Sequence, residues 1–182
     1  MVVDVYNTNN KYKIIYADPP WKYKVWREGE GTADKHYPTM HIEEIVGMKD
    51  TIKKISDKDC ILFLWVTFPC LLEGIKTLQE WGFKYKTCGF NWIKRNKVSD
   101  TWFFGLGHWT RANSEICLIA TKGTIKRKSN KVSQIIDTHI EEHSKKPAIV
   151  REKIIELVGD LPRIELFARQ TTEGWDCWGN EV

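Results

Sequence analysis

The sequence lacks the motifs that mark several large enzyme classes. It has no Gly-x-x-x-x-Gly-Lys-Ser/Thr loop and no Gly-x-Gly-x-x-Gly after an apolar run, and the Gly105-Leu106-Gly107 fragment is too short to replace either. Nucleoside-triphosphate and nicotinamide chemistry are therefore disfavoured. No Gly-x-Ser-x-Gly sequence supplies a nucleophile, so a hydrolase interpretation has no mechanism to rest on.

Metal-binding and membrane-spanning patterns are missing as well. The five cysteines include no Cys-x-x-Cys pair, and the five histidines have no ligand spacing with carboxylates. We therefore expect reduced, buried thiols and no metal. No apolar stretch approaches the about 18 residues that a membrane span requires, and no basic segment followed by an apolar run opens the chain. We expect a cytoplasmic protein of a bacterial or phage-infected cell, with no membrane contact.

The composition is that of a globular protein. The chain has 182 residues, of which 42% are hydrophobic and 29% charged, so we expect a single domain over residues 1–182. A net charge of +4 is compatible with a polyanionic partner but does not demand one. Nine tryptophans are unusual, and they indicate either core packing or flat surfaces for stacking bases, with packing favoured for most of them.

Apolar runs alternate with helical patterns along the chain. The runs typical of strands are 12–17, 60–66, 83–93, 114–121, 134–137 and 163–167, and the helical patterns are 41–55, 69–81 and 147–158. This alternation predicts an α/β fold with three layers, Rossmann-like, around a mainly parallel twisted sheet. Ligands bind such sheets at the carboxyl ends of the strands, where Asp18 and Arg169 both fall. Two aperiodic segments, 22–40 and 96–111, are candidates for loops that cover a substrate.

The tetrapeptide Asp18-Pro19-Pro20-Trp21 directly follows the first apolar run. The amino nitrogen of adenine is a poor nucleophile because its lone pair is delocalised, so an enzyme has to hold both hydrogens with acceptors. The Asp18 carboxylate and the Pro19 carbonyl would be these acceptors, the two prolines would fix the loop, and Trp21 would stack on or wall the base. A simple strand-ending turn, with Trp21 in the core, explains the tetrapeptide equally well.

Segments along nearly the whole chain resemble one family. They are ADPPW (17–21), YPTM (37–40), LFLWV (62–66), WIK (92–94), GHW (107–109), KKP (145–147), IELFARQ (164–170) and GW..WGNE (174–181). In this order the set is similar to the N6-adenine methyltransferases that include the catalytic subunit of the eukaryotic messenger-RNA methyltransferase and DNA adenine methyltransferases of bacteria, phages and ciliates. The resemblance implies a methyltransferase fold with the catalytic motif N-terminal to the main cofactor motif, and S-adenosylmethionine as the cofactor.

The resemblance also implies roles for particular residues. The catalytic residues would be Asp18, Pro19, Pro20 and Trp21, and Trp21, Tyr37 and Trp92 would meet the target base. The cofactor-binding residues would be Asp18, Lys146, Arg169, Thr171, Thr172, Asn180 and Glu181. Lys146 would contact the methionine carboxylate, while Asn180 and Glu181 would bind ribose hydroxyls.

Some features leave alternatives open. The family often has His-Asn in place of Thr171-Thr172 and glutamine in place of Glu181, which weakens those assignments. Tyr37 and Trp92 could equally be packing aromatics. The basic cluster of segment 122–131 could pair with phosphates or form a solvated loop, and consists of Lys122, Lys126, Arg127, Lys128 and Lys131.

The favoured function is transfer of a methyl group to adenine N6 in DNA, because the chain is little more than a catalytic domain. RNA methylation needs the same catalytic residues and stays open as an alternative. An inactive nucleic-acid-binding subunit is a further alternative, against which the intact Asp18 loop and Lys146 argue. Family analogy favours a homodimer.

Overall fold

The computed structural model describes residues 1–22, 39–107, 109–142 and 144–182. The strands are β1 (Tyr12–Ala17), β2 (Ser56–Val66), β3 (Lys84–Arg95), β4 (Ser114–Lys122), β5 (Ile135–His139), β6 (Arg163–Leu166) and β7 (Asp176–Trp178). The helices are α1 (Ile42–Gly47), α2 (Lys49–Ile55), the 3₁₀ turn η2 (Phe68–Cys70), α3 (Leu71–Glu80) and α4 (Ile149–Val158).

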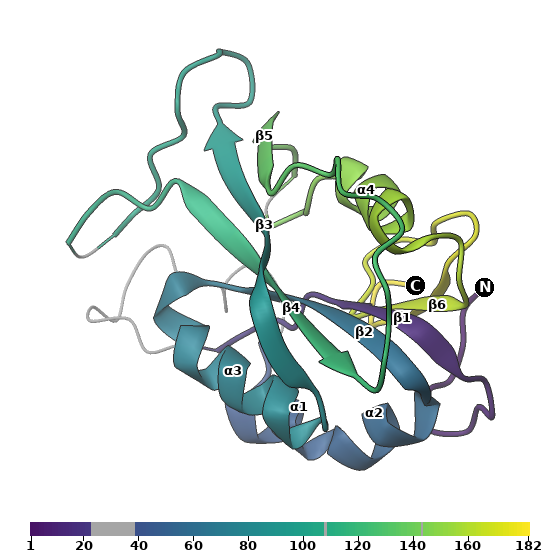
Figure 1. The fold of residues 1–182 in the computed structure, drawn as a ribbon. Helices are drawn as coiled ribbons and strands as arrows, with labels where there is room; N and C mark the ends of the chain where they lie inside the picture. The colour runs from purple at the N-terminus through teal and green to yellow at the C-terminus, as the bar shows by residue number, and fades with distance from the viewer. Residues whose placement is uncertain (23–38, 108, 143) are drawn as a thin grey trace.

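The described strands form a twisted sheet in the order β5-β3-β4-β2-β1-β6-β7 (Figure 1). β1 runs parallel to both of its neighbours, β2 and β6, and the β3–β5 and β6–β7 pairs are also parallel. Only β4 runs against its neighbours β2 and β3 within this sheet. The predicted mainly parallel sheet is confirmed.

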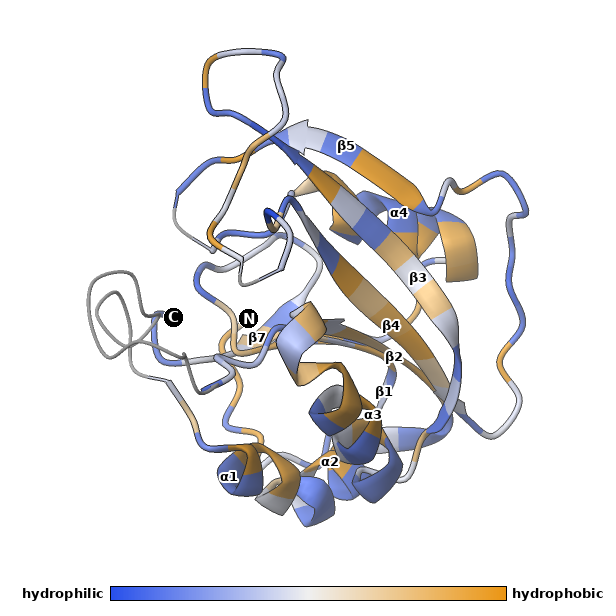
Figure 2. Ribbon diagram, turned by 90° about the vertical axis from the view of Figure 1, so that its left-hand side faces the viewer, coloured by the Kyte–Doolittle hydropathy of each residue, from blue (hydrophilic) through white to orange (hydrophobic). Residues whose placement is uncertain are grey.

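Helices cover both faces of the sheet, which gives the predicted three layers (Figure 1). Successive side chains of β1 point to opposite faces of the sheet, since Ile15 packs against the α1–α3 layer and Ile14 against the α4 layer. Figure 2 shows the central strands as mostly hydrophobic and the outer helix faces as mostly hydrophilic. Burial of each large apolar side chain contributes about 1.5–3 kcal/mol, so these two cores hold the sheet in place.

Some predicted boundaries differ from the structure. The pattern over 41–55 predicted one helix, but α1 and α2 are two short helices that meet at Met48, whose φ and ψ of −70° and 0° depart from regular helix. β2 begins four residues earlier than the apolar run, at Ser56. β7 was not predicted, because a strand of three residues is too short to show a period.

The predicted α4 helix ends where expected. Gly159 follows its last residue with φ of +94°, a conformation that glycine adopts without the cost of a Cβ. In the described part of the chain, no helix combines the length and the apolar character that a bilayer crossing would need.

Candidate functional site

Asp18 lies at the carboxyl edge of the sheet, directly after β1 and between the ends of β2 and β6. Its backbone follows Ala17, which pairs with Leu64 of β2 and with Leu166 of β6. Parallel neighbours on both sides bring three carboxyl ends together, and such an edge leaves a crevice above the central strand. The fold therefore presents the Asp18 loop where a ligand can reach it.

Backbone hydrogen bonds fix the shape of the Asp18-Pro19-Pro20-Trp21 loop. The Trp21 N–H donates to the Pro19 carbonyl at 2.8 Å, and the Met40 N–H donates to the Pro20 carbonyl at 2.9 Å. The Lys22 N–H donates in return to the Met40 carbonyl at 3.1 Å. A carbonyl oxygen has two lone pairs, so Pro19 retains one for a further donor. The prolines do not remove every competing N–H group, because that of Trp21 remains.

Trp21 itself lies in the core beneath the loop. Its indole N–H donates to the Trp65 carbonyl at 2.9 Å, and its side chain belongs to the cluster packed against α1–α3. Trp21 is not among the residues that line the cavities at Asp18. This placement fits the packing alternative of the sequence analysis, and contact of Trp21 with the base stays a prediction.

A chain of ion pairs joins the Asp18 carboxylate to the loop before α4 and to strands β4 and β3. Lys146 Nζ donates to Asp18 Oδ2 at 2.8 Å and lies 3.3 Å from Glu115 Oε2, with the Ser144 carbonyl as a third acceptor at 3.2 Å. Glu115 also pairs with Lys94. The Lys146 side chain is only 8% exposed, so these charges interact with little screening by water. Sequence reasoning assigned Asp18 and Lys146 but gave no role to Lys94, although it ends the WIK segment, and it missed Glu115, which no motif marks.

The burial of this network sets its protonation states. Desolvation raises the pKa of Asp18 above its usual value, although Lys146 opposes the shift. Burial also disfavours the charged form of Lys146, but Asp18 and Glu115 outweigh it and raise the pKa of the ammonium. For Glu115, burial works against the two lysines, which prevail and lower the pKa to about 2. The site therefore holds a cation between two carboxylates whose pKa values are shifted in opposite directions.

The Glu115 shift predicts a pH dependence of stability. A carboxyl group whose folded pKa is depressed stabilises the fold above its ordinary pKa of 4.5, and this contribution is lost as the pH falls toward about 2. We expect the free energy of unfolding of the parent to fall over this window, and that of Glu115→Gln to fall less. Urea denaturation at a series of pH values measures both. Equal acid sensitivity of the two proteins would contradict the assignment.

A cavity of about 340 Å³ opens beside the Asp18 loop. It is lined by Asp18, Pro19, Pro20, Met40, Ser144, Phe167, Ala168, Arg169, Trp178, Gly179, Asn180 and Glu181. Its volume lies within the roughly 300–1,000 Å³ of small-molecule sites. Ser144 and Phe167 are the two non-glycine residues with positive φ in the described chain, at 62° and 61°, and both lie on this wall. Backbone strain of this kind is often stored at binding sites.

A smaller, polar cavity of about 60 Å³ adjoins it and shares Asp18, Phe167, Arg169 and Glu181 with the larger one. Its wall includes a buried pair in which Arg151 donates to both carboxylate oxygens of Glu165, at 2.7 and 2.6 Å. Arg151 also lies over the ring of Tyr16, 5.7 Å from its centroid. Cations and carboxylates therefore share the wall of the space behind Asp18.

The predicted cofactor residues divide into two groups. Arg169, Asn180 and Glu181 line the large cavity, and Arg169 Nε donates to Glu181 Oε1 at 2.9 Å. Thr171 is exposed and Thr172 partly buried, and neither lines the two cavities at Asp18. The structure thus brings Lys146, Arg169, Asn180 and Glu181 together around Asp18, while the cofactor roles of Thr171 and Thr172 stay predictions.

The two remaining substrate predictions are placed differently. Trp92 is buried in the core on the α4 side, where its indole N–H donates to Thr138 Oγ1 at 2.9 Å. This burial fits the packing alternative for Trp92, and its contact with the target base stays a prediction. Tyr37 lies outside the described residues, as does most of segment 22–40.

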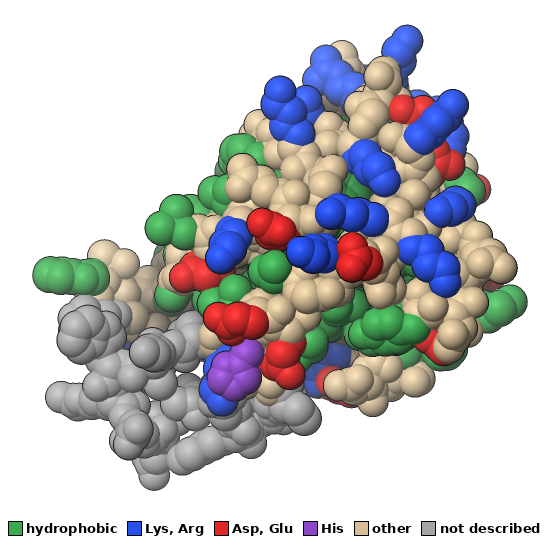
Figure 3. Space-filling view, turned by 90° about the horizontal axis from the view of Figure 1, so that it is seen from below, with side chains coloured by type: hydrophobic (Ala, Val, Ile, Leu, Met, Phe, Trp, Pro, Cys, Tyr) green, Lys and Arg blue, Asp and Glu red, His purple; other side chains and the backbone are tan. Residues whose placement is uncertain are grey.

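The basic cluster of segment 122–131 lies away from the site. Lys122, at the end of β4, pairs with Cys60 in the first half of β2, toward the end of the sheet opposite Asp18. Figure 3 shows Lys and Arg side chains spread over much of the face seen from below, mainly away from the grey segment. The cluster is thus remote from the Asp18 cavity.

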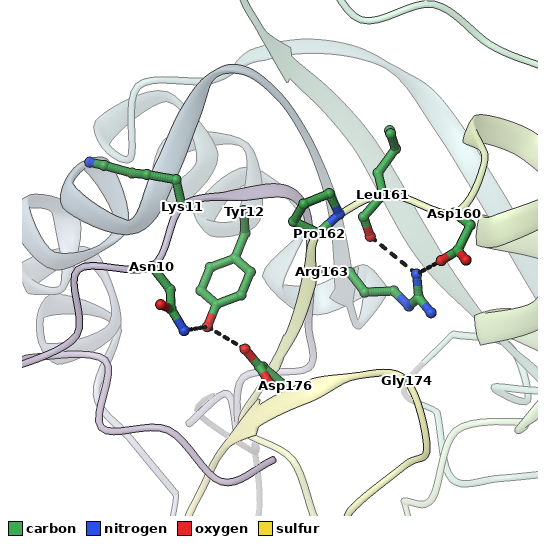
Figure 4. Close-up of a pocket in the computed structure, with 9 residues that line it drawn as sticks. All are labelled: Asn10, Lys11, Tyr12, Asp160, Leu161, Pro162, Arg163, Gly174 and Asp176. Carbon is green, nitrogen blue, oxygen red and sulfur yellow. Dashed lines mark hydrogen bonds and ion pairs between the residues drawn. The ribbon is translucent and has the colours of Figure 1, made fainter.

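A second wide hollow is also remote from Asp18. It has a volume of about 520 Å³ and lies at the amino ends of β1 and β6 (Figure 4). The Tyr12 hydroxyl donates to Asp176 at 2.8 Å there, and Arg163 donates to the Leu161 carbonyl at 3.1 Å. Since its polar groups largely satisfy one another and its opening is wide, size alone does not make it the candidate site. No group of metal-ligating side chains occurs in the part of the chain that the structure describes.

Comparison with known proteins identifies what this arrangement is similar to. Residues 12–181 match the model of the MT-A70 family. The chain is 35% identical to the Type II methyltransferase M.MunI of Mycoplasma sp, over 94% of this chain and 78% of that protein. It is 27% identical to a putative N(6)-adenosine-methyltransferase MT-A70-like protein of Medicago truncatula and 26% identical to an N(6)-adenosine-methyltransferase MT-A70-like protein of Arabidopsis thaliana. These matches cover 94% of this chain but only 26% and 24% of the plant proteins.

Proposed function

The chain belongs to the MT-A70 methyltransferase family, and from this premise we propose that it transfers a methyl group from S-adenosylmethionine to the N6 amino group of adenine in DNA. The observation that carries the proposal is the partly buried Asp18 carboxylate, paired with Lys146 and followed by Pro19, at the wall of a cavity on the carboxyl edge of the sheet. The continuous sheet supports a single methyltransferase domain over residues 1–182.

The residues around the cavity fit the cofactor. Lys146, on the wall of the adjoining smaller cavity, offers a buried cation for the methionine carboxylate, and Asn180 with Glu181 on the larger one offers donors and acceptors for ribose hydroxyls. Phe167 and Trp178, in edge contact at 5.4 Å between ring centroids, form an apolar wall for a planar base. When bound, S-adenosylmethionine supplies an already activated methyl group. The chain's own task is to hold and orient the nitrogen that receives it.

Asp18 and Pro19 would perform this task. The Asp18 carboxylate accepts one hydrogen of the amino group, and the free lone pair of the Pro19 carbonyl accepts the other. Held in this way, the nitrogen lone pair loses conjugation with the ring and becomes available to attack. Because the Asp18 pKa is raised, its carboxylate is also a competent acceptor for the proton that the methylated nitrogen has to release.

The preference for DNA rests on the comparisons. Identity to the type II methyltransferase is 35%, against 27% and 26% for the two plant proteins named for N(6)-adenosine, so the chain is more similar to a relative that is not named for the ribonucleoside. Matched DNA and RNA oligonucleotides incubated with the protein and labelled S-adenosylmethionine, followed by digestion to nucleosides, test it. We expect N6-methyladenine from DNA at a rate above that from RNA. A higher rate on RNA would reverse the substrate assignment and leave the chemistry intact.

Two further proposals accompany this function. The first is that the chain binds S-adenosylmethionine, because Lys146 and Asn180 are intact. Calorimetry tests this proposal, and failure to bind the cofactor would indicate an inactive subunit. A homodimer is proposed from family analogy alone, and sedimentation velocity of the purified protein tests it.

A further inference from the structure

The N–H donors of Lys146 are all in use within the site. An ammonium group has three of them. Lys146 Nζ lies 2.8 Å from Asp18 Oδ2 and 3.3 Å from Glu115 Oε2. Its third acceptor is the Ser144 carbonyl at 3.2 Å. Lys146 therefore brings positive charge to the site, but a bound carboxylate has to take its hydrogen bonds from another residue.

Arg151, in the first turn of α4, keeps donors that are not in use. A guanidinium group has five N–H donors. Nε and Nη2 of Arg151 each donate to one carboxylate oxygen of Glu165, at 2.7 and 2.6 Å. No other hydrogen-bond acceptor among the described residues meets Arg151, so both hydrogens of Nη1 and one of Nη2 stay available. Glu165 thus occupies one edge of the planar group, and the Nη1–Nη2 edge suits a second carboxylate in the same bidentate manner.

The position of Arg151 suits a small anionic group. Arg151 lines the cavity of about 60 Å³ that adjoins the larger one. A water molecule takes about 30 Å³ in the liquid, so this cavity accepts a group of about two or three heavy atoms, such as a carboxylate, and is too small for a base. The larger cavity, of about 340 Å³, shares Asp18 and Phe167 with it. Together the two cavities suit a ligand with a large planar body and a short charged tail.

The charges on the wall of the small cavity suit a tail that carries both signs. Four cations and four carboxylates line it, so neither sign prevails. The cations are Lys145, Lys146, Arg151 and Arg169, and the carboxylates are Asp18, Glu142, Glu165 and Glu181. The amino-acid end of S-adenosylmethionine carries one carboxylate and one ammonium group, so it adds no net charge to this balanced wall.

We propose that the Nη1–Nη2 edge of Arg151 binds the carboxylate at the methionine end of the cofactor. The inference rests on the proposed function and deepens it, since it names the group that fixes this end of S-adenosylmethionine. Lys146 then attracts the carboxylate through its charge, while its hydrogen bonds stay with Asp18 and Glu115. One cation thus orients the cofactor, and the other supports the carboxylate that holds the substrate.

Titration calorimetry with two ligands tests the proposal without methyl transfer. Decarboxylated S-adenosylmethionine lacks only the carboxylate, so the ratio of its dissociation constant to that of S-adenosylmethionine measures what the carboxylate contributes to binding. We expect a ratio of about 10–100 for the parent, because the contact joins two charged groups. Arg151→Met combined with Glu165→Gln removes the donor and leaves no buried carboxylate unpaired. We expect the ratio in this double variant to fall by about 5-fold or more.

Lys145→Met is the matched control, because Lys145 lines the same cavity but pairs with the exposed Glu141 at 2.7 Å. This variant should keep the ratio of the parent. A purely structural role of Arg151 would weaken the binding of both ligands alike and leave their ratio unchanged in the double variant. An unchanged ratio there, or a ratio that falls in Lys145→Met instead, would overturn the proposal.

The same titrations separate this inference from the proposed function. A parent that methylates adenine but binds the two ligands equally would overturn the role of Arg151 alone. If the ratio falls as expected but the parent methylates no adenine, the carboxylate contact stands and the proposed function fails. A parent that binds neither ligand would overturn both.

Discussion

Lys146→Met should lose methyl transfer by about 100-fold or more and should also unfold more readily. Lys146 is the cation nearest to Asp18, at 2.8 Å, and it also faces Glu115. Burial already raises the pKa of Asp18, and without the ammonium the pKa rises further, which favours the protonated carboxyl over the carboxylate that accepts from the amino group. Removal of a single preorganised polar group at a reacting centre costs about 10²–10³-fold in rate.

The effect on stability has the same origin. Methionine leaves Asp18 without its ion pair in a largely buried position, and breaking such a pair costs about 3–5 kcal/mol. Urea denaturation measures this cost. Lys145→Met is the control for stability, because it removes only the exposed pair with Glu141, worth about 0–1 kcal/mol.

The pH dependence of Lys146→Met separates a chemical role from a structural one. Residual methyl transfer should increase with pH, because a carboxyl group with a raised pKa ionises as the pH rises. A pH-independent residual rate, or a rate near that of the parent, would refute the coupling between Lys146 and Asp18.

Arg151→Met should destabilise the fold by about 3–5 kcal/mol. Arg151 and Glu165 are 11% and 8% exposed and are joined by two hydrogen bonds, so the substitution leaves a buried carboxylate without its partner. Desolvation already raises the pKa of Glu165 against the attraction of Arg151. Loss of the guanidinium therefore favours the neutral carboxyl and removes the stability that came from the pair.

A double variant distinguishes a lost pair from lost packing. Arg151→Met combined with Glu165→Gln removes both charges, and we expect it to recover much of the stability lost in the single variant. Denaturation midpoints of the three proteins measure the coupling. If the double variant is less stable than Arg151→Met alone, the penalty comes from packing and not from an unpaired charge.

Local patterns predicted those parts of the fold that local chemistry determines. Segment 12–17 has the apolar, β-branched residues of a strand and is β1, and Pro147 and Gly159 frame α4 as predicted. The direction of β4 could not be predicted, because it depends on pairing with β2 and β3 across long stretches of chain. β7 was not predicted because a strand of three residues is too short to show an alternation of apolar and polar side chains.

The sequence predicted which residues belong to the site, but it did not predict the contacts that these residues make with one another. Resemblance selected Asp18 and Lys146, which lie 128 positions apart, yet no pattern showed that they form an ion pair or that Glu115 joins them. Trp21 illustrates the converse. The motif predicted a wall for the base, but the neighbouring Trp65 carbonyl offers the indole a partner inside the core. Such a choice depends on tertiary packing, which spacing along the chain does not record.

The account depends most on the Asp18 carboxylate as the group that holds the adenine amino nitrogen. Asp18→Ala leaves Lys146 paired with Glu115, so the variant keeps a partner for its buried cation. Methyl transfer from S-adenosylmethionine to a DNA oligonucleotide, read by mass spectrometry of the digested nucleosides, is the direct test. We predict N6-methyladenine from the parent and at least about 100-fold less from Asp18→Ala. Equal N6-methyladenine from a folded Asp18→Ala protein would contradict the account.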